Sequence, residues 1–189
     1  MKSWWMLMTD VDTALELRDV PLPEPGPGQL RVRVHASGIN FAETRMRAGT
    51  YSGQTLPFVM GMESAGVVEK VGSDVTYVQP GDHVVTCLSV FCGTCDQCTT
   101  GRTVLCTDTT VKMMPGQSNR MQWKKPEKLN QFLNLSSFAE QMLVHENAIV
   151  KIRKEMPLEL AALIGCGVIT GYGAVVNTAK VDRKSTRLN

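Results

Sequence analysis

The 189-residue sequence predicts a mainly β fold, a barrel or sandwich of short strands, followed by a helical segment. Polar and apolar residues alternate along 29–36, as they do in a half-buried strand. Further strand-like runs cover 64–71 and 82–88, and each lies beside a turn that contains glycine. From Pro157 to Lys180 the apolar residues follow a helical pattern instead.

The elements follow one another with clear boundaries. A proline- and glycine-rich connector, 21–28, excludes helix before the first alternating strand. The turn 72–74 closes the second strand, and Pro80-Gly81 introduces the third. A polar stretch, 107–135, has little periodicity, and we expect its basic part, 120–125, to be an exposed loop. The segments 138–144 and 148–152 are expected to be the closing strands.

Composition limits the classes of partner. The net charge is only +2, so neither nucleic acid nor an anionic membrane surface is an expected partner. The apolar run in the first ten residues is too short for a signal sequence. Six cysteines without an export signal indicate a reducing compartment, and we expect a cytoplasmic protein.

One uncharged segment, Leu160 to Val176, has the minimum length of a membrane span. It contains four glycines, and Gly167-x3-Gly171 matches a helix-dimer motif. The glycines divide the run, so we predict a buried helix–turn–helix of a soluble fold. A membrane anchor is the alternative.

Four cysteines form the pattern C-x2-C-x2-C-x7-C within a lobe of about 88–108: Cys92, Cys95, Cys98 and Cys106. Two-residue spacers let thiolates converge on one ion, and four thiolates close the coordination sphere of zinc. We therefore predict one structural Zn²⁺. An iron–sulfur cluster and disulfides are the alternatives, although iron–sulfur runs close with different spacing. Cys87 lies outside the pattern, and we expect it to be a buried strand residue.

Several motifs occur in an order that resembles one family. They include Pro-Gly-Pro-Gly before the first alternating strand, Gly61-Met62-Glu63-Ser64-Ala65-Gly66, Gln79-Pro80-Gly81-Asp82, the four cysteines, and Gly165-Cys166-Gly167 followed by Thr170-Gly171-Tyr172-Gly173. From about residue 10 to 181 the chain resembles the N-terminal part of zinc-containing medium-chain alcohol dehydrogenases. That resemblance implies a GroES-like barrel over 1–155, with 156–181 as the first helices leading into a Rossmann domain that is missing here.

The resemblance also implies a second, catalytic zinc, which polarises the alcohol oxygen in that family. Asn40 and Met62 occupy positions where the family has a cysteine and a histidine ligand, and neither side chain replaces their affinity for zinc. Cys166 matches the third ligand, and Glu63 matches a carboxylate beside the metal. Ala42 falls where a proton-relaying hydroxyl is expected. We predict that the catalytic zinc is absent, and that Met62 fills core and Cys166 is an inert buried thiol.

The segment 38–51 instead resembles the zinc-independent quinone oxidoreductase branch of the same superfamily. The expected function is hydride transfer between NAD or NADP and a small alcohol, carbonyl or quinone, by a full-length parent that can form a homo-oligomer. Gly165-Cys166-Gly167 follows a helical run and lacks a third glycine, so it is not a dinucleotide loop and the chain itself is expected to be inactive. A non-catalytic zinc-binding module and a membrane-associated metalloprotein are the alternatives.

The last eight residues, 182–189, match one reading frame of a common sequencing-adapter oligonucleotide. We therefore expect this tail not to be native protein sequence, and we exclude it from the fold prediction.

Overall fold

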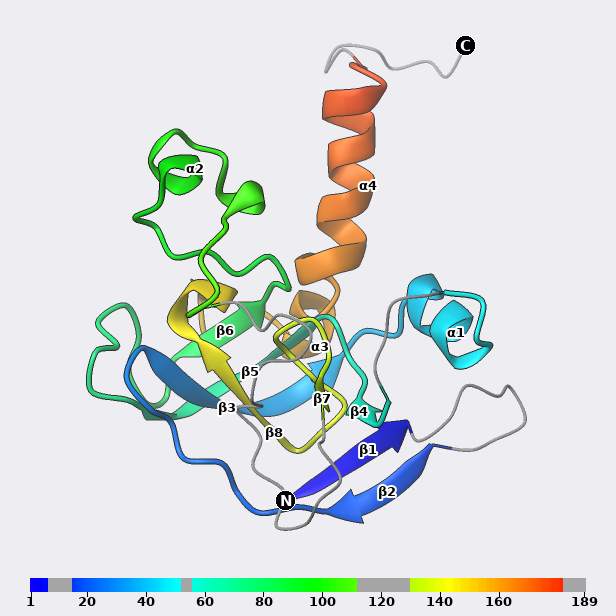
Figure 1. Cartoon of the computed structure of the whole chain (residues 1–189), viewed down its shortest axis with the longest axis vertical. Coiled ribbons are helices and arrows are strands. Elements are labelled where there is room, and N and C mark those ends of the chain that lie inside the picture. The colour runs from blue at the N-terminus through cyan, green and yellow to red at the C-terminus, as the bar shows by residue number, and fades with distance from the viewer. Residues whose placement is uncertain (7–14, 52–55, 112–129, 182–189) are drawn as a thin grey trace.

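The structure, a computed structural model, describes residues 1–6, 15–51, 56–111 and 130–181. It is mainly β, with two sheets, a lobe at one end and a long helix that projects from the sheets (Figure 1). The mainly β prediction is therefore confirmed. The tail 182–189 and the basic run 120–125 lie outside the described residues.

The larger sheet has the order β8-β3-β5-β6-β9, and all of its neighbouring strands are antiparallel. Its strands are β3 (Gln29–Ser37), β5 (Ser64–Val71), β6 (His83–Thr86), β8 (Gln141–His145) and β9 (Ile149–Ile152). Along β3, Leu30 and Val32 are fully buried while Arg33 is exposed, so the predicted alternation is confirmed. The buried side chains pack with Val68 of β5 and Val84 of β6 in the main core.

The smaller sheet has the order β2-β1-β4-β7. Its strands are β1 (Lys2–Met6), β2 (Glu16–Asp19), β4 (Phe58–Val59) and β7 (Asn130–Gln131). Backbone hydrogen bonds join β1 to the segment before β8: Trp4 N donates to Phe138 O at 2.8 Å, and Glu140 N donates to Lys2 O at 2.9 Å. These bonds draw 138–140 toward β1, so β8 begins at Gln141 rather than at the predicted residue 138.

The strand-and-turn region contains a helix that the sequence analysis missed, α1 (Phe41–Arg47). Asn40 is its N-cap, and Glu43 Oε2 accepts a hydrogen bond from Asn40 N at 2.8 Å. An Asn-x-x-Glu spacing is a capping-box signature, and it marks the start of this helix. The short helical turns of the remaining chain are α2 (Asp96–Thr99), η1 (Thr103–Leu105) and η2 (Glu146–Ala148).

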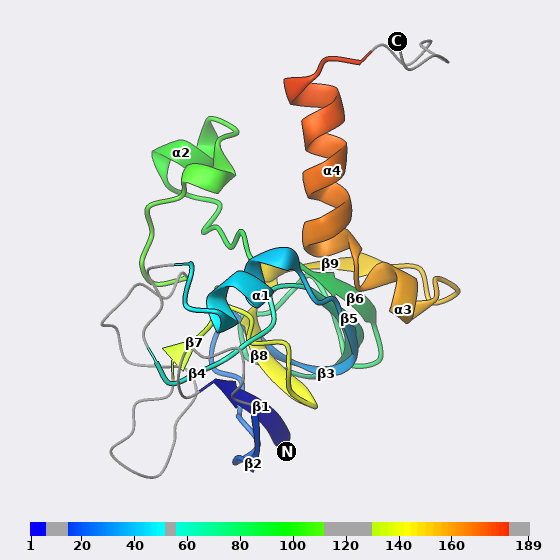
Figure 2. The ribbon, with the colours of Figure 1, turned by 90° about the vertical axis from the view of Figure 1, so that its right-hand side faces the viewer.

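The prediction of a buried helix–turn–helix at 160–176 is wrong. The segment is one helical run made of α3 (Leu158–Ala161), η3 (Ile164–Val168), α4 (Ile169–Gly173) and η4 (Ala174–Thr178). Figure 2 shows it standing away from the sheets, and only 17% of its most apolar window is buried. Its length and composition match those of a membrane-spanning helix, as do those of many helices in soluble proteins.

The glycines do not end this run, which continues as one helix from Leu158 to Thr178. Val168 N donates to Leu163 O at 2.9 Å, a wide π-type turn. Gly165 has a packing role, since a Cβ there would lie 1.8 Å from Thr86 O of β6. Cys87 also differs from its prediction: β6 ends at Thr86, and Cys87 is only partly buried.

Candidate metal centre

The cysteine lobe, residues 88–108, positions its four thiols from a loop and two short helical turns. Cys92 and Cys95 lie in the loop, Cys98 lies on α2, and Cys106 directly follows η1. Gly93 and Gly101 have φ of +84° and +80°, values that side chains with a Cβ rarely adopt, so the turns around the thiols require glycine. Asn147 Nδ2 donates to Phe91 O at 2.8 Å and ties the lobe to the barrel.

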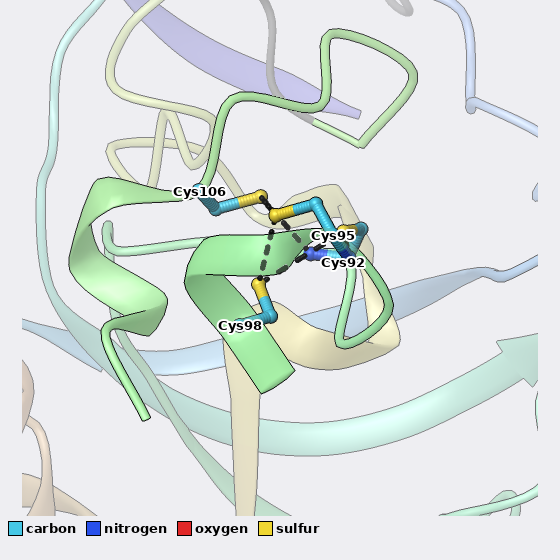
Figure 3. A group of neighbouring side chains, drawn as sticks. All are labelled: Cys92, Cys95, Cys98 and Cys106. Carbon is cyan, nitrogen blue, oxygen red and sulfur yellow. Dashed lines mark hydrogen bonds between the residues drawn. The ribbon is translucent and has the colours of Figure 1, made fainter. Parts of the chain in front are cut away.

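The four sulfur atoms converge on one point, as Figure 3 shows. All four Sγ atoms lie within 4.8 Å of one another. The separations are 3.5 Å for Cys95–Cys98, 3.9 Å for Cys92–Cys98 and 4.0 Å for Cys95–Cys106. Four thiolates at about 2.3 Å from a tetrahedral zinc lie about 3.8 Å apart. The residues therefore fit a tetrahedral thiolate site that leaves no position for substrate.

Backbone amides surround the sulfurs. Thr94 N and Cys95 N lie 3.4 and 3.3 Å from Cys92 Sγ, and Cys92 N lies 3.3 Å from Cys106 Sγ. The bonds from Thr94 lower the pKa of the Cys92 thiol, and amide donors of Cys98 and Thr107 lower the pKa of Cys95 to about 6. Burial acts the other way on Cys98 and raises its pKa to about 11. The donors stabilise the thiolate form that binds metal.

A second cluster brings together all four residues of the predicted vestigial site. Glu63, which precedes β5, is 1% exposed, and its carboxylate accepts three hydrogen bonds. Asn40 Nδ2 donates to its Oε1 at 2.8 Å, and the amides of Cys166 and Gly167 donate to its Oε2 at 2.8 and 3.1 Å. Met62 Sδ lies 3.7 Å from Cys166 Sγ. We call Glu63 with Asn40, Cys166 and Gly167 the Glu63 network.

This second cluster does not fit a catalytic zinc. Both oxygens of Glu63 are occupied by N–H donors, and Met62 and Asn40 offer only neutral, weak ligands. Within the described ranges, the cysteine lobe is the only place where three or more His, Cys, Asp or Glu side chains gather as for a metal. Met62 is 4% exposed and packs in the second core cluster, which confirms its core role. Cys166 is only partly buried, which differs from the predicted buried thiol.

Three further residues shape this cluster and were missed by the sequence analysis. The hydroxyls of Ser37 and Ser137 donate to Glu63 O at 2.7 and 3.1 Å, so they hold the backbone of Glu63. Glu43 is 1% exposed, and its Oε2 accepts a hydrogen bond from Asn40 N. The Asn-x-x-Glu spacing points to Glu43 as a cap, but no local pattern pairs Ser37 with a serine 100 residues away.

The electrostatics of this cluster reflect its burial. Burial raises the pKa of Glu43 above its usual value, and the charge of Glu63 adds to that effect. Burial and the charge of Glu63 also raise the pKa of the Cys166 thiol. A thiol with a raised pKa is a weaker nucleophile and metal ligand at neutral pH.

An open hollow of about 780 Å³ borders this cluster. Its apolar lining comes from β1, β2, β3 and the segment before β8, and includes Trp4, Leu17, Val34 and Phe138. Ser37, which holds Glu63, also lines it. A mostly apolar wall with a few polar groups is typical of sites for small organic ligands.

Comparison with known proteins identifies the family to which this fold belongs. The model of the alcohol dehydrogenase GroES-like domain matches residues 26–154. The chain is 33% identical over 181 residues to S-(hydroxymethyl)glutathione dehydrogenase of Saccharomyces cerevisiae, covering 94% of this chain and 47% of that protein. The chain spans about half the length of the curated relatives that it matches.

Solved structures of alcohol dehydrogenases have the same fold as this chain. An alcohol dehydrogenase zinc-binding domain protein from Burkholderia ambifaria superimposes with a TM-score of 0.81 at 33% identity, covering 95% of this chain and 49% of that one. Benzyl alcohol dehydrogenase from Acinetobacter calcoaceticus has a TM-score of 0.79, also at 33% identity, with coverage of 95% and 48%. With the family model matching most of the chain, the chain belongs to the alcohol dehydrogenase GroES-like domain family, and its fold is the GroES-like one that the motif order implied.

Proposed function

We propose that this chain is the substrate-side part of an NAD- or NADP-dependent oxidoreductase, carries one structural zinc, and does not catalyse hydride transfer by itself. The observation that carries the proposal is the convergence of four thiols on a barrel of the alcohol dehydrogenase family. The relatives are alcohol dehydrogenases, which supports a small alcohol or aldehyde as the substrate class.

The structural metal is held by Cys92, Cys95, Cys98 and Cys106. Zinc bound there supplies folding energy to the lobe and no Lewis-acid chemistry, because four thiolates complete its coordination. The cysteine lobe packs against the main core through Cys98 and Cys106, so its order is coupled to that of the barrel. The barrel residues that line the open hollow beside Ser37 are the part proposed to bind and orient substrate.

The domain division proposed is a barrel over 1–155 and the start of a cofactor-binding domain over 156–181. The exposed apolar side chains of the helical run support it, because contiguous apolar surface of this kind marks an interface with another domain. Hydride transfer needs the nicotinamide beside the substrate, and in the longer protein the domain after this helix places it there. We propose that the longer protein is cytoplasmic and forms a homo-oligomer.

A zinc-independent carbonyl, quinone or enone reductase is the second candidate. It is favoured by the Glu63 network, in which N–H donors of Asn40, Cys166 and Gly167 occupy both oxygens of Glu63 and the amide of Asn40 is a weak metal ligand. A non-catalytic zinc module is the third, and differs in predicting no activity in any longer protein.

The test is to express both the 189-residue chain and the longer protein recovered from the genomic locus. The proposal expects NAD(P)-dependent alcohol oxidation or carbonyl reduction by the longer protein only, with one zinc retained by both. Enone or quinone reduction that survives chelation of loosely bound metal would select the second candidate. A longer protein with bound zinc and no turnover on alcohols, aldehydes, quinones or enones would contradict the first two.

A further inference from the structure

Hydrogen bonds hold both the backbone and the side chain of Glu63. Its backbone oxygen accepts hydrogen bonds from Ser37 and Ser137, and its side chain is 1% exposed. A Cβ at Gly38 would lie 2.3 Å from Glu63 Oε1, so the backbone there leaves room for the carboxylate. The group is therefore preorganised before any partner approaches it.

The three donors that reach this carboxylate come from segments far apart in the sequence. Asn40 caps α1, whereas Cys166 and Gly167 belong to η3, more than 100 residues later. Charge-assisted hydrogen bonds of this kind are roughly twice as strong as neutral ones. One side chain thus connects the α1 cap, the start of β5 and the helical run.

The wide turn of η3 is explained by the same contacts. The amides of Cys166 and Gly167 point to Glu63 Oε2 instead of to helical carbonyl groups, and Val168 N reaches back five residues to Leu163 O. Helix amides that leave the i−4 pattern bond to another acceptor, either a protein group or water. Glu63 is that acceptor.

We propose that Glu63 is a positioning residue, and that its hydrogen-bond network holds the helical run on the barrel in place of a metal at the family's catalytic position. In this arrangement the first turns of the helix are fixed by Glu63 and by the contact of Gly165 with Thr86. A catalytic zinc is excluded for two reasons. N–H donors already bond to both oxygens of Glu63, and Asn40 and Met62 are not strong zinc ligands. This inference does not depend on the zinc of the cysteine lobe.

The first test is amide hydrogen exchange, read by NMR at Cys166 and Gly167. Glu63→Gln removes the charge and one of the two acceptor oxygens, so the charge-assisted bonds to both amides are weakened and exchange at Cys166 and Gly167 should become roughly 10- to 100-fold faster. Glu69→Gln is the matched control, since Glu69 lies on β5 and pairs with Arg33 at the surface. Exchange at Cys166 and Gly167 that is equal in wild type and Glu63→Gln would overturn the proposal.

The second test is a gain of metal binding, which misfolding cannot imitate. Asn40→Cys and Met62→His in one chain remove a donor from Glu63 and supply a thiolate and an imidazole beside Cys166. The wild type should bind one zinc and the double variant two, by atomic spectroscopy. A double variant that binds no more zinc than the wild type would overturn the explanation by missing ligands at positions 40 and 62. A wild type with a second zinc that Cys166→Ser removes would overturn the exclusion of metal. Loss of zinc from the cysteine lobe would instead count against the proposed function and leave this inference standing.

Discussion

At the residue scale, each of the four thiols of the cysteine lobe is a proposed metal ligand. Cys98 is buried on α2, and its Sγ lies 3.5 Å from Cys95 Sγ and 3.9 Å from Cys92 Sγ. The spacing of the cysteines was enough to predict this cluster, because ligand spacing in thiolate knuckles is local in the sequence. The Glu63 network could not be predicted in the same way, since its donors are more than 100 residues apart.

Replacing Cys98 should therefore release the zinc. Cys98→Ser is expected to lower zinc affinity by more than about 100-fold. Removal of a group that only hydrogen-bonds to a metal ligand costs about 10- to 100-fold, and removal of the ligand itself costs more. The control is Cys87→Ser, which lies outside the cluster and should keep its zinc. Equal zinc content in the two purified variants, measured by atomic spectroscopy after mild chelation, would argue against the four-thiolate site.

Glu43 gives a pH dependence whose sign follows from its burial. Its pKa is raised in the folded protein above the usual 4.5, so the folded state binds the proton more tightly than the unfolded state does. The stabilisation is complete below pH 4.5 and is lost as the pH rises through the folded pKa. Glu43→Gln keeps a neutral side chain, so it should gain stability relative to wild type as the pH rises above 4.5.

The measurement is urea unfolding of both proteins between pH 4.5 and pH 8. Glu155→Gln, at an exposed carboxyl group, is the control and should follow wild type across this range. A difference between Glu43→Gln and wild type that does not change with pH would show that burial does not affect this carboxyl group.

At the scale of elements, the helical run shows where sequence patterns failed. The strands at 29–37, 64–71 and 149–152 agree closely with their predicted ranges, because alternation and flanking turns are local signals. The glycines at 165–173 were expected to break the helix. Instead Gly165 allows the helix to contact β6, a role that depends on a strand 80 residues earlier and that no local pattern reveals.

Two glycine substitutions separate packing from helix propensity. Gly165→Ala would place a Cβ 1.8 Å from Thr86 O, so the protein should lose about 1–3 kcal/mol of unfolding free energy. A Cβ at Gly171 meets no atom of the described residues within 4 Å, so Gly171→Ala should gain about 0.5–1 kcal/mol, since alanine favours helix. Chemical denaturation measures both, and equal effects of the two changes would contradict the close contact between the helix and β6.

For the whole molecule, the notable feature is a row of exposed apolar side chains along the long helix. The side chains of Val168, Ile169, Tyr172 and Val175 are each 47–67% exposed. Contiguous apolar surface of this kind favours association. The barrel beneath it has its own cores, so the helix rather than the barrel is the expected source of self-association.

Polar substitution of this surface should therefore improve solubility. Val168→Lys with Tyr172→Glu is expected to reduce concentration-dependent self-association of the 189-residue chain, followed by sedimentation velocity. Val150→Lys, at an exposed strand position on the barrel, is the control and should leave association unchanged. Self-association that persists in the helix variant would place the associating surface elsewhere.

The central claim is that a closed tetrathiolate zinc holds the lobe on a barrel that lacks a catalytic metal. X-ray absorption at the zinc edge, combined with the zinc content per chain, tests it most directly. We predict one zinc per chain with four sulfur neighbours at about 2.3 Å. Nitrogen or oxygen neighbours, or a second zinc per chain, would contradict it.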